Sequence, residues 1–294
     1  MISPDGLILL NKPPGITSFQ SLGAVKRKYR GVKVGHAGTL DKFAQGLVLC
    51  LVGGFTRLNP FFTQMDKTYL AVITLGTETS TLDPEGAVVC EKAPPEAINW
   101  ENLQERFLGE QRQVPPVFSA VHVEGKRAYK RALQGESVQL SPRNITIHSL
   151  ELIDYTCPRL TIRVRCSKGT YIRSLARDVG LYLDSCGYLS SLVRESIGPF
   201  SLEQAVSPDA LNHPEASPLA GRDVFERIPG LGVLAISPEF ETAVSQGVPL
   251  RDDFFSERPE AEGIYALFCR EKLLAVAELH NNLWKYRMVR PVLS

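Results

Sequence analysis

The sequence lacks the long apolar runs that a membrane protein needs. A membrane-spanning helix needs about 18 consecutive apolar residues. No apolar stretch in this chain of 294 residues comes close to that length. The opening segment, MISPDGLILLNKPPG, also lacks the basic n-region and the long hydrophobic core of a secretory signal peptide. We therefore expect a cytoplasmic protein that makes no contact with a membrane.

Cysteine is sparse and never closely paired. The six cysteines stand at positions 50, 90, 157, 166, 186 and 269, with no CxxC spacing among them. Structural zinc needs closely paired ligands on each side of the metal, and this pattern does not supply them. We expect no metal site, and reduced thiols that are mostly buried.

The short motifs of the common enzyme classes are missing as well. The chain has no GxGxxG after a strand, no Walker-type phosphate loop, no HExxH and no GxSxG. These absences argue against the common nucleotide-dependent enzymes, zinc peptidases and serine hydrolases. The residues left for chemistry are polar side chains in glycine-punctuated loops.

The net charge of +1 conceals an uneven distribution. Residues 1–173 carry 22 Lys and Arg against 15 Asp and Glu, whereas residues 174–294 carry 11 against 17. A basic first part suits a polyanionic partner such as a nucleic acid, although uneven charge is common among enzymes.

Strand-like and helix-like segments are mixed without the regular βαβ order of a parallel sheet. The pattern of the sequence changes near residue 229, after which short strand-like runs surround the acid-rich stretch 252–262. We predict an α+β fold with a mixed, largely antiparallel sheet in residues 1–228 and a small β-rich domain in residues 229–294. Strands are expected at 7–10, 47–52, 69–75, 145–155, 160–166, 264–269 and 273–279, and helices at 99–108 and after Gly169.

A further helix is expected near the N-terminus. Thr17 or Ser18 can cap it, and its spacing places Phe19, Leu22 and Val25 on one face. Five cations follow between residues 26 and 33. They suit either the helix dipole or contact with phosphates, and the spacing alone does not choose between these.

Asp41 is the acid that the loops present most clearly. It follows Gly35 and Gly38, which permit close approach of a ligand, but it can equally be the N-cap of a helix that begins at Lys42. Its spacing alone favours the cap. From its position in the sequence alone, His36 is also expected to be an ordinary hydrogen-bonded loop histidine.

Two further segments carry polar groups that are ambiguous when taken singly. Tyr69 opens a strand two residues after Lys67 and is by itself an ordinary strand aromatic. The segment from Lys168 to Arg173 joins a strand to a helix, so its amides can face an anion or form a plain tight turn.

Taken in order, these segments resemble the TruB family of pseudouridine synthases over about residues 7–200. The matching segments are Leu10–Ser18 (LNKPPGITS), Gly35–Asp41 (GHAGTLD), Lys67–Tyr69 (KTY), Pro115–Ala120 (PPVFSA), Gly125–Tyr129 (GKRAY), Cys166–Leu175 (CSKGTYIRSL), and Leu192, Arg194, Gly198 and Phe200. Any one segment could arise by chance, whereas several in the right order identify the chain as similar to that family.

The resemblance implies a role for each residue of a site. It makes Asp41 the catalytic nucleophile, Tyr69 the stacking partner of the base, and Arg173 the cation that pairs with Asp41. The remaining implied contacts are to the substrate: Tyr171 and Leu192 line the uracil pocket, His36 helps to fill the space left by the flipped base, Lys12 supports the region, and Gly38 and Lys168 lie beside it.

The family's reaction is the isomerisation of uridine-55 in the T loop of transfer RNA, which needs no cofactor. The resemblance thus implies a tRNA T stem-loop as the partner, a PUA-like C-terminal domain, and a monomer that works without a protein partner. Two departures stand out: Lys42-Phe43 replaces the usual Pro-Leu or Pro-Phe after the aspartate, and Phe118 replaces a tyrosine. The alternatives are a guide-RNA-dependent synthase subunit and an RNA-folding chaperone whose catalysis is dispensable.

Overall fold

The computed structural model describes residues 5–119, 122–123, 126–127, 140–212, 217–259 and 261–290. Most of the predicted motif 125–129 and of the basic tract 126–131 therefore lies outside the described residues. Within these ranges, no helix has the length and apolar composition that crossing a membrane requires.

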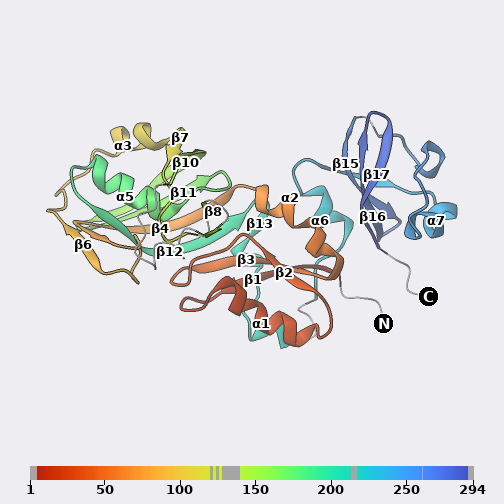
Figure 1. Cartoon of the computed structure of the whole chain (residues 1–294), viewed down its shortest axis with the longest axis horizontal. Coiled ribbons are helices and arrows are strands. Elements are labelled where there is room, and N and C mark those ends of the chain that lie inside the picture. Colours follow the sequence, from red (N-terminus) through yellow and green to blue (C-terminus); the bar gives the residue numbers. More distant parts are fainter. Residues whose placement is uncertain are drawn as a thin grey trace.

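A nine-stranded, largely antiparallel sheet forms the larger part of the molecule, and it is called the large sheet below (Figure 1). Its strands run in the order β1-β3-β12-β4-β11-β10-β7, with β2 and β13 attached at β3 and β12. Within this sheet, as far as the structure describes it, β12 and β3 form the one parallel pair. The strands are β1 (Gly6–Lys12), β2 (Val34–Ala37), β3 (Gln45–Val52), β4 (Lys67–Leu75), β7 (Gly109–Gln113), β10 (Arg143–Thr156), β11 (Arg159–Cys166), β12 (Gly187–Ile197) and β13 (Phe200–Ser201).

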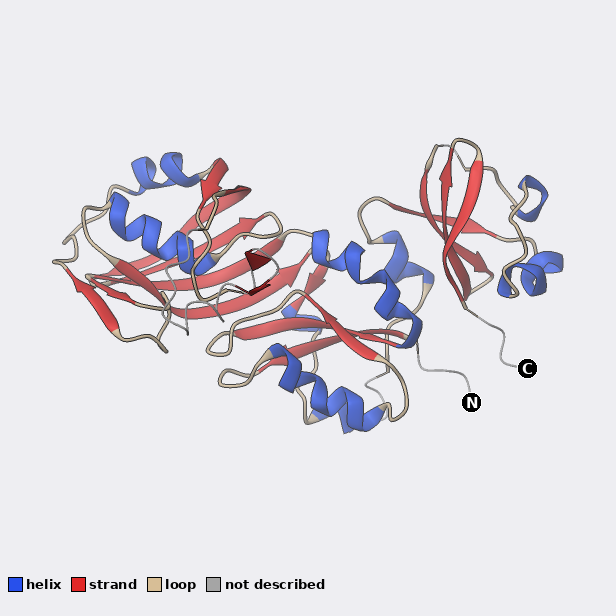
Figure 2. Ribbon diagram, viewed as in Figure 1, coloured by secondary structure: helices blue, strands red, loops and turns tan. Residues whose placement is uncertain are grey.

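Strand β4 shows why these residues form the large sheet. Alternate residues from Lys67 to Leu75 are buried, which is the period of two that a half-covered strand requires. Helices α3 (Trp100–Phe107) and α5 (Ile172–Tyr182) cover that face (Figure 2). Apolar side chains of both helices join one buried cluster with those of β4, β10 and β11. The predicted α+β class with a largely antiparallel sheet is confirmed.

The N-terminal helix α1 (Ser18–Lys28) corrects one detail of the sequence prediction. Thr17 caps it, and the side chains of Thr17 and Gln20 complete a capping box. Leu22 and Val25 are buried as expected, but Phe19 is 67% exposed. At 100° per residue, Phe19 lies well to the side of the stripe that buries Leu22 and Val25. Its ring instead faces Lys26, whose Nζ is 4.3 Å from the ring centroid.

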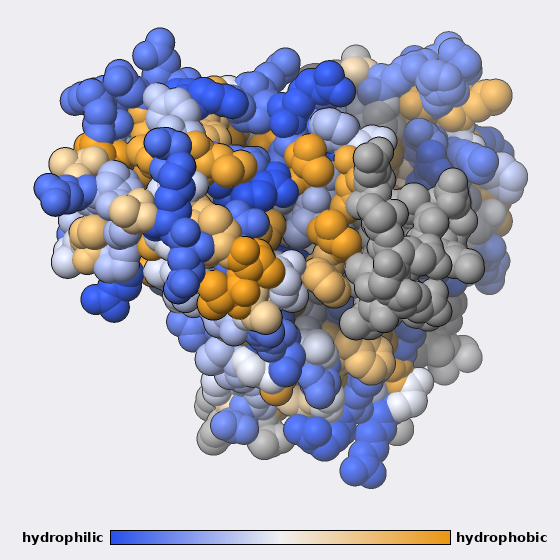
Figure 3. All heavy atoms as spheres, turned by 60° about the vertical axis from the view of Figure 1, so that its left-hand side comes forward, coloured by the Kyte–Doolittle hydropathy of each residue, from blue (hydrophilic) through white to orange (hydrophobic). Residues whose placement is uncertain are grey.

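A small hairpin projects from the end of the large sheet. Strands β5 (Thr77–Thr79) and β6 (Val88–Glu91) form it, and the turn between them reaches back toward the helix α5. Figure 3 turns this end of the molecule forward and shows apolar side chains in patches among hydrophilic ones. Val88, Val89, Leu181 and Tyr182, from β6 and α5, are exposed apolar or aromatic side chains. A second short hairpin pairs β8 (His122–Val123) with β9 (Lys126–Arg127).

The C-terminal part forms a separate four-stranded sheet, called the C-terminal sheet below, at the right of Figure 1. Its strands are β14 (Leu231–Ala235), β15 (Gly263–Cys269), β16 (Lys272–His280) and β17 (Leu283–Val289). Phe225 joins the two parts, since its ring meets those of Phe55 and Phe268 edge to face, each at 5.4 Å. The remaining short elements are α2 (Asn59–Gln64), α6 (Arg222–Glu226) and α7 (Glu241–Ser245), and the 3-10 turns η1 (Gly53–Leu58), η2 (Leu202–Gln204), η3 (Ala210–Asn212), η4 (Pro238–Phe240) and η5 (Asp252–Phe254).

All six cysteines are free thiols. Cys50, Cys166, Cys186 and Cys269 are buried, and Cys90 and Cys157 are exposed. The expectation of reduced, mostly buried thiols is confirmed.

Candidate active site

Asp41 lies in a loop between β2 and β3, and no helix follows it. The chain passes from Asp41 through a short bend directly into β3, so the N-cap favoured by spacing alone is wrong. Its carboxylate meets Arg173, in the first turn of α5. Nη2 of Arg173 donates to Oδ1 at 3.1 Å, and Nε lies 2.9 Å from Oδ2, close enough for an ion pair but not aligned as a hydrogen bond.

Arg173 is held by more than Asp41. Its Nη1 donates to the carbonyl of Thr81 at 3.0 Å and to Oδ2 of Asp83 at 3.2 Å. Its Nη2 also donates to the carbonyl of Phe118 at 3.1 Å. The guanidinium is thus a buried bridge between two carboxylates from separate loops, and its planar fork fixes the direction of both.

A cavity of about 490 Å³ opens beside this ion pair. Six of the residues predicted for the site line it, from four separate segments of the chain: Gly38, Asp41, Tyr69, Tyr171, Arg173 and Leu192. Its other walls come from residues 39–40, 63, 67, 118–119, 167, 169–170, 172 and 194. The structure therefore brings the predicted catalytic trio to one cavity.

Tyr69 is 8% exposed, and its neighbours on β4 hold it in the wall of that cavity. Burial raises the pKa of its phenol to about 12, and the Arg194 guanidinium beside it opposes only part of this effect. The hydroxyl thus keeps its proton at neutral pH. It can donate a hydrogen bond, but it is not a resting base.

The pKa of Asp41 is set by opposing effects. Burial raises the pKa of its carboxyl group most strongly, the Arg173 guanidinium lowers it, and the negative charge of Asp83 raises it again. The balance leaves the pKa above its ordinary value. Arg173 therefore preserves an ionised carboxylate in surroundings that would otherwise favour its neutral form.

Arg194 is a fully buried cation that shapes the Asp41 loop. It lies on β12, and its guanidinium donates to the carbonyls of Leu47 at 2.7 Å, Gly38 at 3.2 Å and Thr39 at 3.4 Å. Gly38 has a φ of 77°, which an L side chain rarely adopts. One buried arginine thus fastens the loop on both sides of Asp41.

Lys12 lies beneath the same loop. Its Nζ donates to the carbonyls of Pro13, Ile16 and Lys42, at 3.0, 2.7 and 3.3 Å. Burial lowers the pKa of Lys12 to about 8. The side chain does not line the cavity, so the structure gives Lys12 a supporting position, with its ammonium group already used.

His36 and Lys168 also stand outside the cavity lining. His36 lies on β2 with Nδ1 buried and unpartnered, and burial lowers the pKa of its ring, which favours the neutral form. Lys168 is exposed, and its ammonium group donates to the side chain of Gln64. Lys42, the unusual residue after Asp41, pairs with Glu85 at 3.2 Å, so its added charge is balanced.

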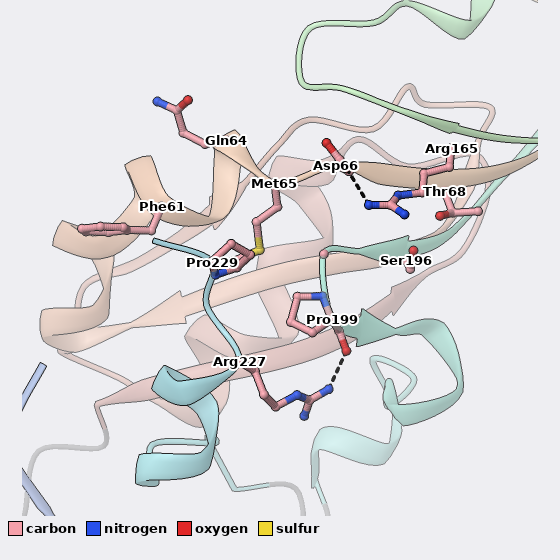
Figure 4. Close-up of a pocket in the computed structure, with 11 residues that line it drawn as sticks. Phe61, Gln64, Met65, Asp66, Thr68, Arg165, Ser196, Pro199, Arg227 and Pro229 are labelled. Atoms are coloured by element: carbon pink, nitrogen blue, oxygen red, sulfur yellow. Dashed lines mark hydrogen bonds and ion pairs between the residues drawn. The ribbon is translucent and has the colours of Figure 1, made fainter. Parts of the chain in front are cut away.

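A second cavity, of about 400 Å³, lies between α2, the start of β4, the β12–β13 turn and the segment before β14 (Figure 4). Its cations already have partners: Arg165 pairs with Asp66 at 2.9 Å, and Arg227 donates to the carbonyl of Pro199. None of the predicted catalytic residues lines it. We therefore place the candidate site at the Asp41 cavity.

Sequence reasoning missed three residues that build the site: Asp83, Arg194 and Lys67. Lys67 and Arg194 lie within segments that resemble the family, so their motifs could have indicated them. Asp83 stands in a turn of ordinary turn residues, Asp83-Pro84-Glu85-Gly86, which gives no local signal. Among the described residues, no three His, Cys, Asp or Glu side chains lie close enough together to hold a metal ion.

Solved structures share this fold. A structure described as a Cbf5-Nop10-Gar1 complex superimposes with a TM-score of 0.70 and 23% identity, over 98% of this chain and 87% of that one. A structure of the archaeal box H/ACA sRNP Nop10-Cbf5 complex gives 0.69 at 21% identity, over 97% and 86%. These likenesses define the fold class.

Sequence comparisons give the family. Residues 26–172 match the TruB family pseudouridylate synthase, N-terminal domain. The chain is 40% identical to a tRNA pseudouridine synthase B of Azoarcus sp. (strain BH72), covering 98% of this chain and 93% of the relative. It is also 40% identical to one of Borreliella burgdorferi (strain ZS7), over 76% and 80%. The chain belongs to the TruB family of pseudouridylate synthases.

Proposed function

We propose that this protein converts uridine-55 in the T loop of tRNA to pseudouridine, with Asp41 as the nucleophile. The observation that carries the proposal is the Asp41–Arg173 ion pair in the wall of a cavity that Tyr69 also lines. Relatives that are 40% identical and named tRNA pseudouridine synthase B support tRNA as the substrate.

The chemistry suits these side chains. The C1′–N1 bond of uridine breaks, the uracil turns, and a C1′–C5 bond forms; C5 then loses its proton and N1 gains one. No electrons are exchanged with another molecule and no atoms are added, so the reaction balances without a redox partner. Asp41 supplies the carboxylate for a covalent step, and Arg173 keeps it ionised and aimed.

The substrate base must leave the RNA stack before Asp41 can reach it, at a cost of a few kcal/mol. Stacking on an aromatic ring is worth about 1–3 kcal/mol per base, and the ring of Tyr69 is the candidate partner. Leu192 and Tyr171 complete an apolar and aromatic wall around the detached uracil. These groups offset much of the cost of flipping.

The rest of the chain would hold the RNA. The cations from Lys26 to Lys33 lie in the last turn of α1 and directly after it, with no acid among them, so they suit contact with phosphates. We propose that residues 229–294 form a PUA-like RNA-binding domain. We also propose that residues 1–228 form the catalytic domain, and that the protein acts in the cytoplasm as a monomer without a protein partner.

The test is tritium release from a T stem-loop RNA that carries C5-labelled uridine, with the purified protein alone. The wild-type protein should release tritium, and Asp41→Asn should bind the RNA normally but release none. Asp178→Asn is the matched control, because Asp178 pairs with Arg177 at 2.8 Å on the same helix as Arg173 but does not line the cavity. Turnover by Asp41→Asn would discard the nucleophile, and wild-type turnover only with an added guide RNA or protein would favour the guide-dependent alternative.

A further inference from the structure

The connection between β11 and α5 forms one wall of the Asp41 cavity. Gly169, Thr170, Tyr171 and Ile172 all line the cavity, and Arg173 follows at once. Tyr171 is the N-cap residue of α5, but no side chain caps this helix from the N-cap position. The carbonyl of Tyr171 accepts from the backbone N–H of Leu175 at 3.0 Å, but its own N–H needs a partner from elsewhere in the fold.

Gln113 supplies the acceptor for this N–H and a second donor to the carbonyl. It is the last residue of β7, and its side chain is buried, with 4% of the residue exposed. Its Oε1 accepts from the backbone N–H of Tyr171 at 2.8 Å, and its Nε2 donates to the backbone carbonyl of Tyr171 at 3.1 Å. One side-chain amide therefore pairs with both polar groups of a single residue, as a neighbouring strand would.

The short segment that follows β7 accepts three hydrogen bonds from side chains of α5, one of them from Nη2 of Arg177 to the carbonyl of Val114 at 3.2 Å. The hydroxyl of Ser174 donates to the carbonyl of Val114 at 2.8 Å, and Nη2 of Arg173 donates to the carbonyl of Phe118 at 3.1 Å. Phe118 and Ser119 form the facing wall of the cavity. The Gln113 amide thus lies where two walls of the cavity, the segment after β7 and the start of α5, are hydrogen-bonded to each other.

We propose that Gln113 is a positioning residue for the isomerisation, which sets Tyr171 in the cavity wall and, through the first turn of α5, holds Arg173 against Asp41. The inference rests on the proposed function. Gln113 touches no reacting atom, because it does not line the cavity. Its effect reaches the chemistry only through the backbone of residues 171–173.

The experiment compares Gln113→Met, which has similar length and neither hydrogen-bonding group, with the wild-type protein and a matched control. The control is Gln104→Met, because Nε2 of Gln104 donates to the carbonyl of Leu150 at 2.6 Å, between α3 and β10 and away from the cavity. Single-turnover tritium release, the Kd for the T stem-loop RNA and amide hydrogen exchange at residues 171–174 are measured on each protein.

Gln113→Met should lower the single-turnover rate about 10- to 100-fold, as expected for a small misplacement of catalytic groups, with the Kd changed less than about threefold. Exchange at residues 171–174 should accelerate. The acid limb of its pH–rate profile should move to higher pH, because Asp41 would lose part of Arg173 while Asp83, Glu85 and Lys12 still act on it. Gln104→Met should keep the wild-type rate and acid limb.

Two results would overturn the proposal: a Gln113→Met rate within about twofold of wild type, or a rate loss that Gln104→Met shares in proportion to its lost stability. If Gln113→Met does not fold, Gln113→Asn, which keeps the amide but falls one carbon short, carries the same expectations. Wild-type turnover separates the two claims. An active wild type with an unaffected Gln113 variant refutes the positioning role alone, and an inactive wild type refutes the proposed function together with it.

Discussion

Asp83→Asn tests whether the second carboxylate beside Arg173 matters to the chemistry. Oδ2 of Asp83 accepts from Nη1 of Arg173 at 3.2 Å, while Oδ1 accepts from the hydroxyl of Thr81 at 2.5 Å and from the backbone N–H of Glu85 at 3.0 Å. All three partners are donors. An asparagine must turn its NH2 group either toward the guanidinium or toward the N–H of Glu85, so at least one of these hydrogen bonds is lost in either orientation.

The size of the effect follows from that loss. A hydrogen bond to a charged group contributes about 1.5–3 kcal/mol. If the whole of this difference appears in the transition state, because Arg173 keeps its charge beside Asp41 but no longer fixes the direction of the carboxylate, the rate of the chemical step falls roughly 10- to 150-fold. The affinity for RNA should change little, since Asp83 is buried behind Arg173 and does not line the cavity.

The substitution also has an effect of opposite sign on titration. The charge of Asp83 raises the pKa of Asp41, so its removal lowers that pKa. Turnover requires the carboxylate form and is lost as the pH falls through the pKa of Asp41. The acid limb of the pH–rate profile should therefore move to lower pH in Asp83→Asn.

Single-turnover tritium release across this pH range, with enzyme in excess, measures both effects, and Asp178→Asn is again the control. A plateau rate within about twofold of wild type would show that Arg173 keeps its place without Asp83, and the argument from its hydrogen bonds would fail. A limb that moved to higher pH would show that the loss of Arg173 outweighs the loss of charge.

Three further predictions test the rest of the site. Tyr69→Phe keeps the ring and loses only a hydroxyl that stays protonated, because burial raises its pKa to about 12. Tyr69→Ala also loses stacking worth about 1–3 kcal/mol, so single-turnover rates should fall less for Tyr69→Phe than for Tyr69→Ala. Arg194→Met removes the donor to the carbonyls of Gly38 and Thr39 in the Asp41 loop and of Leu47 in β3, and it should lower the free energy of unfolding by about 2–4 kcal/mol in urea titrations. Gly46→Ala places a Cβ 2.5 Å from the backbone oxygen of Arg194 at a φ of 113°, and it should lower the free energy of unfolding by about 2 kcal/mol or more in the same assay. The control is Gly23→Ala in α1, where the nearest atom to the new Cβ is 3.5 Å away, and this change should be neutral or stabilising.

Local sequence signals predicted the elements well where one face is buried. The alternation in β4 and in β11, and the spacing of apolar residues in α5, are imposed by the core and can be read without knowing the partners. The order of the strands was beyond such signals. β4 lies between β11 and β12, and β3 pairs in parallel with β12 about 150 positions later in the chain, contacts that no short window contains.

Asp41 shows how tertiary context overrides a local preference. An Asp followed by Lys42 and Phe43 is a reasonable helix start, but β3 begins at Gln45 and is paired on one side by β1 and on the other by β2 and β12. Those pairings demand an extended chain immediately after the bend. The resemblance to a family made this residue a site candidate, and the structure places it in a cavity wall beside Arg173, whereas its local surroundings alone predicted a cap.

The charges of the cavity explain how it can receive an anionic nucleotide although its central residue is an acid. Asp41 and Asp83 share Arg173, which leaves this trio with one net negative charge. Arg194 and Lys67 also line the cavity, and both donate to main-chain carbonyls, which carry no net charge. Their positive charges are thus held in place without being neutralised by those partners. Because burial lowers the pKa of Lys67 to about 8, its positive charge persists at neutral pH and is lost above that value. The formal charges of the trio, Arg194 and Lys67 therefore leave a positive excess at neutral pH, which disappears as the solution becomes alkaline.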